Sequence, residues 1–475
     1  MDILNKEAWE QKALIKAGAL SVSELMQETL ARRELVNPKV NALVNILSKE
    51  ACEKLASAEC PLEGALGGMP MAIKDLANVK GFKTTEGSPL YSERVAQKDD
   101  QMVARLRAAG ALFIGKTNTP EFGLGSNTFN PVYGKTKNPY DLTRTCGGSS
   151  GGAAVALATR MLSISDGSDM MGSLRNPAAW NNVYGLRPTW GLVPPEPSGE
   201  IFLSQLSTLG PMARSPKDLA LLLDVQANHF DNKSYVSQSK RFSNFTAQPR
   251  MKGIKIGWLG DWGGTLTFED ELLDLAHNAL NEMSSLGAII HDLKAPFAMN
   301  DIWTSWCDLR AWQITNGLRD IYEDIEKRKN LKPEAVWEIE NGLSLSGQDI
   351  YNAALKKSKW YNSASELFEK FDLLVLPSTQ VWPFDLAEIY PVSIKNEKMD
   401  TYHRWMQVTI PAGLLGLPVV NIPIGFGKTG LPAGIQLIGS KGSDGYILSI
   451  AQAWHEHTKW PYVNIPNFNE KRSCL

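Results

Sequence analysis

Three groups of residues, close together in the sequence, have the side chains that acyl-transfer chemistry uses. Lys74 follows the apolar run Met69-Pro-Met-Ala-Ile73, the loop Cys146-Gly-Gly-Ser-Ser-Gly-Gly152 carries two serines, and the segment Ser165–Pro177 contains Ser173. A serine after a glycine-containing turn can present its hydroxyl while neighbouring backbone N–H groups point at one spot, as a nucleophile and an oxyanion hole require. A lysine at a strand end in apolar surroundings can lose its charge through desolvation and then act as a base.

Each group has a more ordinary interpretation when it is taken alone. Most lysines are exposed or ion-paired, and a glycine-rich run is more often a flexible loop or a helix entry than a catalytic element. Ser173 alone is an ordinary polar residue in a loop. The hypothesis of a catalytic site depends on the occurrence of all three groups in one stretch of chain.

Two nearby motifs are interpreted as coincidences of sequence. Gly110–Thr117 fits the phosphate-loop pattern GxxxxGK[ST], but that loop must follow a strand and precede a helix. Here a predicted helix precedes the motif, and Ala111–Ile114 is apolar enough to be a buried strand. Gly147–Gly151 fits the Gly-x-Ser-x-Gly nucleophile elbow, yet the preceding residues 138–145 are polar instead of an apolar strand. A Ser-His-Asp triad therefore gains no support, although distance along the chain does not exclude one.

His455 and His457 could suggest a metal site. They are two positions apart on a predicted helix and so face different sides, and no third ligand accompanies them. We predict two surface histidines and no metal site.

The elements that must position the serines and the lysine alternate between strands and helices. Apolar strands are predicted at 69–73, 111–114 and 162–164, with helices at 100–109 and 152–161 between them, and the same alternation returns over 254–293 and at 371–377. This alternation indicates a layered α/β fold. We predict one domain over 1–475, with a helical region at 1–60, a core at about 62–215 and a helical, tryptophan-rich region at about 300–370. Those tryptophans either pack the helices onto the sheet, which is the favoured interpretation, or line a pocket for the substrate.

Composition narrows the classes of function. The 475 residues include 49 Lys and Arg against 51 Asp and Glu, a net charge of −2, which argues against a dedicated nucleic-acid binder. The uncharged stretch between Arg404 and Lys428 contains three prolines, so we predict a buried helix, a turn and a strand at Val419–Ile424 in place of a membrane span. Five scattered cysteines are typical of reduced thiols in a cytoplasmic protein.

Taken together, the three groups resemble the amidase signature family. That family has a strand lysine followed by aspartate (here Lys74-Asp75), a Gly-Gly-Ser-Ser-Gly-Gly loop, and Asp-x-x-Gly-Ser-x-Arg-x-Pro, here Asp169–Pro177. The likeness continues through 184–188 and 209–215, returns at 416–423 and 431–436, and is weakest across 230–400. It implies a three-layer α/β/α fold with a central, mostly mixed β-sheet flanked by helices.

The resemblance also implies a Ser–cis-Ser–Lys mechanism without cofactor or metal. Ser173 would be the nucleophile, Ser149 would follow a cis peptide bond after Gly148, and neutral Lys74 would draw a proton from Ser173 through Ser149. The backbone N–H groups of Met170, Met171, Gly172 and Ser173 would form the oxyanion hole, and the supporting residues would be Ser150, Asp169 and Arg175.

Two details of this implied site depend on the backbone and on the substrate. In some relatives the equivalent of Arg175 contacts a substrate carboxylate. Met171 stands where many relatives have glycine, so a positive φ at that position would cost energy.

The implied activity is hydrolysis of the C–N bond of a small or medium amide, aryl or alkyl, through an acyl-enzyme on Ser173. Carbamates and esters are further candidate substrates, the expected partner is a small-molecule amide, and a homodimer is a hypothesis. The alternative is the glutaminase (A) subunit of a tRNA-dependent glutamyl or aspartyl amidotransferase, which shares these motifs, although the run Asp169–Ser173 and the tryptophans look unlike that branch. A catalytically silent binding protein is disfavoured because Lys74, Ser149 and Ser173 are all present.

Overall fold

The computed structural model describes residues 3–58, 62–196, 200, 202–227 and 241–468. At its centre lies a mixed β-sheet, which has eight strands in the described part of the chain, in the order β10-β9-β11-β15-β14-β7-β8-β6. β9 runs parallel to β10 and β11, and the remaining neighbours are antiparallel. The strands are β6 (Ile164–Asp169), β7 (Tyr184–Arg187), β8 (Thr208–Ala213), β9 (Lys255–Trp258), β10 (Ile289–Asp292), β11 (Leu373–Pro377), β14 (Val419–Phe426) and β15 (Pro432–Ile438).

A smaller sheet beside β6 carries the lysine. Its order is β1-β3-β2, with β1 (Leu43–Val44), β2 (Pro70–Lys74) and β3 (Leu112–Thr117). β2 pairs in parallel with β3, and the backbone N–H of Lys74 donates to Asp166 Oδ1 on β6 at 3.0 Å, which joins the two sheets. Two short pairs, β4 (Phe129–Asn130) with β5 (Gly134–Lys135) and β12 (Ser393–Ile394) with β13 (Glu397–Lys398), lie in loops.

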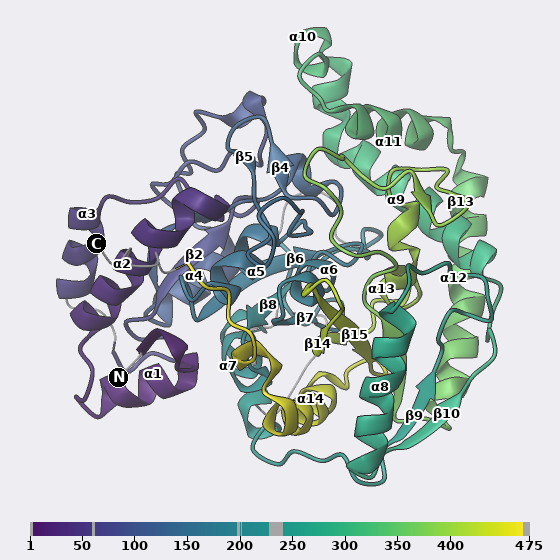
Figure 1. Cartoon of the computed structure of the whole chain (residues 1–475). Helices are drawn as coiled ribbons and strands as arrows, with labels where there is room; N and C mark the ends of the chain where they lie inside the picture. The colour runs from purple at the N-terminus through teal and green to yellow at the C-terminus, as the bar shows by residue number, and fades with distance from the viewer. Residues whose placement is uncertain (1–2, 59–61, 197–199, 201, 228–240, 469–475) are drawn as a thin grey trace.

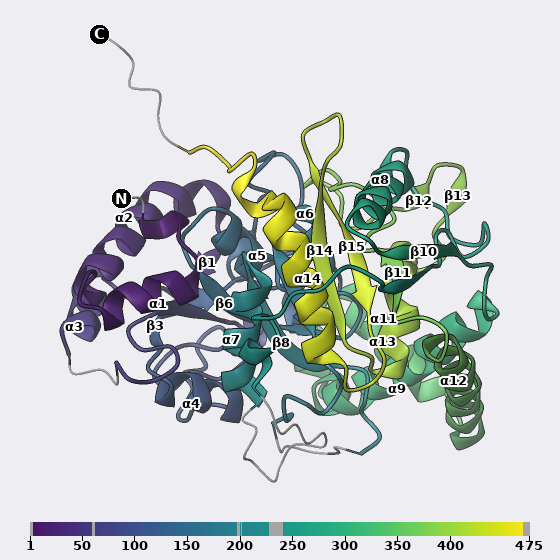
Figure 2. The same ribbon diagram turned by 90° about the horizontal axis from the view of Figure 1, so that it is seen from below.

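Helices flank the central sheet, so the predicted three-layer α/β/α fold is confirmed (Figure 1). Figure 2 shows α7 and α14 side by side over β8 and β14, and α5 and α6 contact the same sheet at β6 and β15. In the described part of the chain, the helices beside the two sheets are α4 (Gln101–Ala108), α5 (Gly151–Ala158), α6 (Asn176–Trp180), α7 (Pro216–Ala227), α8 (Leu272–Ser285), α13 (Ile410–Leu415) and α14 (Asp444–Thr458).

Two helical groups lie at opposite edges of the molecule in both views (Figures 1 and 2). One contains α1 (Ala8–Lys16), α2 (Val22–Val40) and α3 (Lys49–Ser57); the other contains α9 (Met299–Glu323), α10 (Ile325–Arg328), α11 (Pro333–Ser344) and α12 (Gly347–Phe368). α2 begins after Ser21, whose side chain accepts the N–H of Glu24 and thereby satisfies one of the free donors at the helix start. Along α9, Trp306 and Arg310 are buried against the neighbouring helices.

Several predicted elements are confirmed with shifted ends. β3 continues through Gly115–Thr117, so the phosphate-loop motif is a buried strand. Residues 138–145 form no strand in this described segment, as predicted for the residues before the glycine-rich loop. β6 starts at Ile164 and runs on to Asp169, whereas the prediction placed a strand only at 162–164, because the polar residues that follow masked the strand pattern.

The C-terminal predictions are confirmed except for one of the two histidines. The uncharged stretch forms the 3₁₀ helix Arg404–Thr409, α13 and then β14, as predicted in outline. No helix within the described ranges has both the length and the apolar character needed to cross a bilayer.

His457 is exposed as predicted, but the prediction for His455 was wrong. His455 is buried because α14 packs against α7 and the N-terminal segment, where its Nε2 lies 2.9 Å from Glu7 Oε1.

Three of the five cysteines fall within the described residues. Cys52, Cys146 and Cys307 are free cysteines, the first two of them buried. Cys60 and Cys474 lie outside the described residues.

Candidate active site

Lys74 lies at the end of β2 with only 1% of its surface exposed. Its Nζ donates to three hydroxyl oxygens, those of Ser149 at 2.7 Å, Ser150 at 2.9 Å and Ser168 at 3.0 Å. Burial lowers the pKa of the Lys74 ammonium to about 7, while the nearby carboxylates of Asp166 and Asp169 act in the opposite direction. A substantial fraction of this side chain is therefore uncharged at neutral pH.

The glycine-rich loop brings two serines to the lysine. The peptide bond Gly148–Ser149 is cis, as the resemblance implied. Ser126 Oγ donates to the carbonyl of Gly148 at 2.6 Å, and the N–H of Ser150 donates to the carbonyl of Ser173 at 3.3 Å. These bonds tie the loop to the turn that carries Ser173.

Asp169 organises that turn. Its carboxylate accepts the N–H of Gly172 at 2.8 Å and that of Leu174 at 3.1 Å, directly on either side of Ser173. It also forms ion pairs with Arg175 at 2.9 Å and Arg187 at 3.2 Å. Burial alone would raise the pKa of the Asp169 carboxyl, but the two guanidinium groups hold it well below its usual value. The charged carboxylate thus fixes the backbone around Ser173.

The backbone N–H groups of the predicted oxyanion-hole residues are not all free to bind a substrate oxygen. Gly172 has a φ of +85°, which a residue with a Cβ rarely adopts, whereas Met171 has no positive φ and therefore carries no such strain. The N–H of Gly172 already donates to Asp169. Among the described residues, the N–H groups of Met170, Met171 and Ser173 donate to no protein acceptor. These three N–H groups remain open to a ligand in the adjoining cavity, which Met170, Met171 and Ser173 all line.

Arg175 supports the turn and is not free to bind a substrate. It is fully buried, and its guanidinium donates to Asp169, to the carbonyl of Thr409 at 2.7 Å and to Gln436 Oε1 at 2.6 Å. A role like that of the arginine in some relatives, which contacts a substrate carboxylate, is therefore ruled out for Arg175 in this arrangement. Asp169 is a buried carboxylate that needs a positive charge beside it, so Arg175 is held in place as its ion-pair partner.

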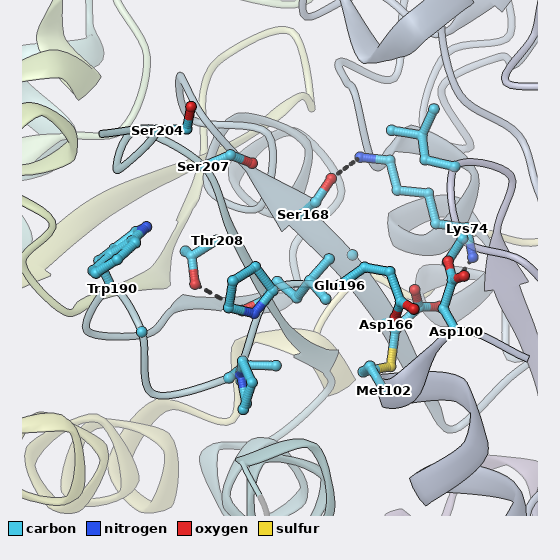
Figure 3. Close-up of a pocket in the computed structure, with 18 of the residues that line it drawn as sticks. Lys74, Asp100, Met102, Asp166, Ser168, Trp190, Glu196, Ser204, Ser207 and Thr208 are labelled. Atoms are coloured by element: carbon cyan, nitrogen blue, oxygen red, sulfur yellow. Dashed lines mark hydrogen bonds between the residues drawn. The ribbon is translucent and has the colours of Figure 1, made fainter. Parts of the chain in front are cut away.

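Two adjoining cavities lie beside the catalytic serines and the lysine. The smaller, of about 90 Å³, contains Ser149 and Ser173, and the larger, of about 290 Å³, contains Lys74. Leu76, Ser168 and Ser207 line both, and Figure 3 shows Ser168 pointing to the Lys74 amine in the larger one. The structure shows no direct hydrogen bond between the hydroxyls of Ser149 and Ser173, which are both described. It thus brings Lys74 into contact with Ser149 and places Ser173 in the same cavity as Ser149.

The tryptophan-rich region lines these cavities with side chains other than tryptophan. The residues of α9 that line them are Arg310, Gln313 and Ile314. Trp303, Trp306 and Trp360 are buried and line neither cavity, as the favoured interpretation predicts, whereas Trp337 is exposed.

Sequence reasoning missed Ser168, the third hydroxyl at the lysine, and Asp166. Both lie on β6 two positions apart, so they share one face of the strand, and both line the larger cavity. Polar residues at alternate positions of a mostly buried strand would have been the signal for them.

The buried charge of Asp169 predicts a large effect on stability. Asp169→Asn keeps the shape of the side chain but leaves two buried guanidinium groups without their carboxylate, so we expect the free energy of unfolding to fall by about 3–5 kcal/mol. Urea denaturation measures this loss. The matched control is Asp141→Asn, because Asp141 pairs with Arg144 at 3.8 Å on the surface and should cost less than about 1 kcal/mol. Equal losses in the two variants would contradict the assigned role of Asp169.

Comparison with known proteins places the chain in a family. The sequence model described as Amidase matches residues 24–448. The A subunit of the glutamyl-tRNA(Gln) amidotransferase from Alkaliphilus metalliredigens is 32% identical over 464 residues, 91% of this chain and 92% of the relative. Its counterpart from Carboxydothermus hydrogenoformans is 32% identical over 97% and 99% of the two chains.

Solved structures agree with these sequence matches. A bacterial aryl acylamidase of the amidase signature family superposes with a TM-score of 0.89 at 27% identity, covering 97% of this chain and 98% of that one. A 6-aminohexanoate cyclic dimer hydrolase gives a TM-score of 0.87 at 25% identity, covering 98% and 99%. The chain therefore belongs to the amidase family, the hydrolases that act on carbon–nitrogen bonds of non-peptide amides.

Proposed function

We propose that this amidase cleaves a small, uncharged amide through an acyl-enzyme on Ser173. The observation that carries the proposal is the contact of 2.7 Å between the Lys74 amine and the Ser149 hydroxyl, at a cavity that Ser149 shares with Ser173. A buried lysine with a pKa of about 7 is a base that can be neutral at physiological pH. In the proposed relay, Ser149 passes the proton from the nucleophile, with which it shares the smaller cavity, to the base.

In the acylation step, neutral Lys74 accepts the Ser149 proton while Ser149 accepts the proton of Ser173, whose Oγ attacks the amide carbonyl carbon. The oxyanion then faces the N–H groups of Met171 and Ser173, which have no other acceptor among the described residues. Collapse of the tetrahedral intermediate breaks the C–N bond, and the proton returns through Ser149 to the departing nitrogen. Water then attacks the ester on Ser173 by the same proton route, which releases the carboxylic acid and restores the serine.

The size and charge of the smaller cavity support a small, neutral acyl group. Its volume of about 90 Å³ is well below the roughly 300 Å³ at which drug-sized ligand pockets begin, and Leu76, Phe122 and Ile314 give it an apolar wall. Arg310 also lines it, but this guanidinium donates to Glu338 Oε1 at 2.6 Å. The ion pair with Glu338 offsets the charge of Arg310 and so weakens its attraction for an acidic acyl group.

A substrate panel tests this proposal. Purified protein is incubated with anilides, alkyl amides, carbamates and esters whose acyl groups increase in length, and the protein is then examined by mass spectrometry for acylated Ser173. We expect acylation and turnover with short neutral acyl groups and a steep loss as the acyl chain outgrows the cavity. Turnover without any acyl adduct on Ser173, or a preference for long acyl chains, would contradict the proposal.

The second candidate is the glutaminase component of a tRNA-dependent amidotransferase, which the 32% identical relatives of that name favour. A glutaminase assay and a pull-down from a cell lysate discriminate between the two. Ammonia release from glutamine, together with capture of the other amidotransferase components, would favour this second candidate. The first candidate requires turnover of small amides by the chain alone.

A further inference from the structure

Three hydroxyl oxygens surround the amine of Lys74, and one of them belongs to neither serine of the Gly-Gly-Ser-Ser-Gly-Gly loop. Ser168 lies on β6 and accepts from Lys74 Nζ at 3.0 Å, nearly as close as Ser149 and Ser150. β6 pairs residue by residue with β8 from Ile164 to Asp169, so the position of Ser168 is set by a sheet and not by a loop. We infer that Ser168 is a positioning residue, which orients the lone pair of neutral Lys74 toward Ser149.

A neutral amine has too few protons to donate to all three hydroxyls. Lysine in its neutral form has two N–H donors and one lone pair, so of three surrounding hydroxyls two must accept and only one can donate. Proton transfer in the proposed function requires that the donating hydroxyl is Ser149. Ser150 and Ser168 must then accept the two N–H groups.

The surroundings of Ser150 fix its part in this scheme. Its hydroxyl donates to the carbonyl of Ser168 at 3.3 Å, and its oxygen also receives the N–H of Ser168 at 3.4 Å. Gly167 makes this approach possible, because a Cβ at that position would lie 2.8 Å from Ser150 Oγ. The Ser150 proton thus points away from Lys74, and its oxygen accepts one N–H. Both contacts use the backbone of Ser168, so they are independent of the Ser168 side chain.

The Ser168 hydroxyl is left as the acceptor for the second N–H. Its own proton can point into the larger cavity, which Ser168 lines together with Lys74 (Figure 3). Without this hydroxyl the amine is free to rotate, and its lone pair no longer faces Ser149 in every molecule. The charged groups that face the amine, Asp166 and Asp169, stay in place when Ser168 is changed.

The inference is tested with Ser168→Ala and Ser168→Thr, using the amide substrate that the panel above identifies. We expect Ser168→Ala to lower kcat by about 10- to 100-fold with little change in KM, since a misplaced catalytic group typically costs rate by such factors. The acid limb of kcat/KM should move to lower pH, because the charged amine loses one of its three acceptors. Ser168→Thr keeps the hydroxyl and should restore most of kcat and the original limb.

Ser365→Ala is the control, because Ser365 lies on the exposed face of α12 and lines neither cavity. Thermal unfolding midpoints within about 3 °C of the unchanged protein verify the fold of each variant. Unchanged kcat and pH profile in Ser168→Ala, or a threonine variant as slow as the alanine variant, would overturn the inference.

The inference rests on the proposed function, so Ser173→Ala is measured in parallel. If Ser173→Ala keeps its activity, the proposed function and the role of Ser168 are both wrong. If Ser173→Ala is inactive, the Ser168 variants alone decide whether Ser168 positions the amine.

Discussion

Ser173→Ala is expected to lose about six orders of magnitude in kcat, the size of effect seen when a serine hydrolase loses its nucleophile. The variant has no oxygen that can attack the amide carbon, and the neighbouring Ser149 hydroxyl lies beside Lys74 in a position to relay a proton. Mass spectrometry should show no acyl adduct after incubation with substrate. The fold should be retained because removing one hydroxyl at the cavity wall breaks no side-chain hydrogen bond shown for Ser173 in the described residues.

The matched control is Ser365→Ala on the exposed face of α12, where the hydroxyl bonds only to the carbonyl of Tyr361 in its own helix. It should turn over substrate at the normal rate. If Ser173→Ala retained a measurable burst of acylation, another nucleophile would have to be sought, and the proposed mechanism would be wrong.

Lys74 should give kcat/KM an acid limb with an apparent pKa of about 7. Burial favours the uncharged amine, so the pKa of the ammonium lies below its ordinary value and the base form becomes populated as the pH rises through about 7. Activity should therefore fall about tenfold per pH unit below this value and level off above it. Initial rates over pH 5 to 9 with a neutral amide substrate measure the limb.

Lys74→Met and Lys74→Arg separate the role of the base from that of the charge. Lys74→Met should lower kcat/KM by about 10²–10⁴-fold, the usual contribution of a general base, and abolish the acid limb. Lys74→Arg should be equally slow, because a guanidinium keeps its proton at every pH of the assay. Lys80→Met on the exposed loop after β2 is the control. An arginine variant with near-normal activity would show that the positive charge, and not proton transfer, is what position 74 supplies.

The local elements around the site could be predicted because each rests on a short-range pattern. The apolar run before Lys74 became β2, the apolar residues after Gly110 became β3, and the small residues after Ser150 became α5. In each case the apolar or small residues are buried together, so hydrophobic periodicity and composition report the element directly. The same rule failed for β6, whose polar residues Asp166 and Ser168 lie beside the buried lysine and interrupt the apolar pattern.

The sequence predicted the class of chemistry, because the lysine, the two serines and the motif around Asp169 lie in one stretch and resemble one family. It also indicated the α/β fold, through the alternation of strands and helices. The folded structure was needed to show that Arg175 is held by Asp169, that the N–H of Gly172 already has an acceptor, and that His455 is buried. It alone brought Ser168 to the amine of Lys74, 94 positions earlier in the chain. The physical reason is that these features depend on contacts between elements distant in sequence, where burial and the pairing of charges outweigh any local preference.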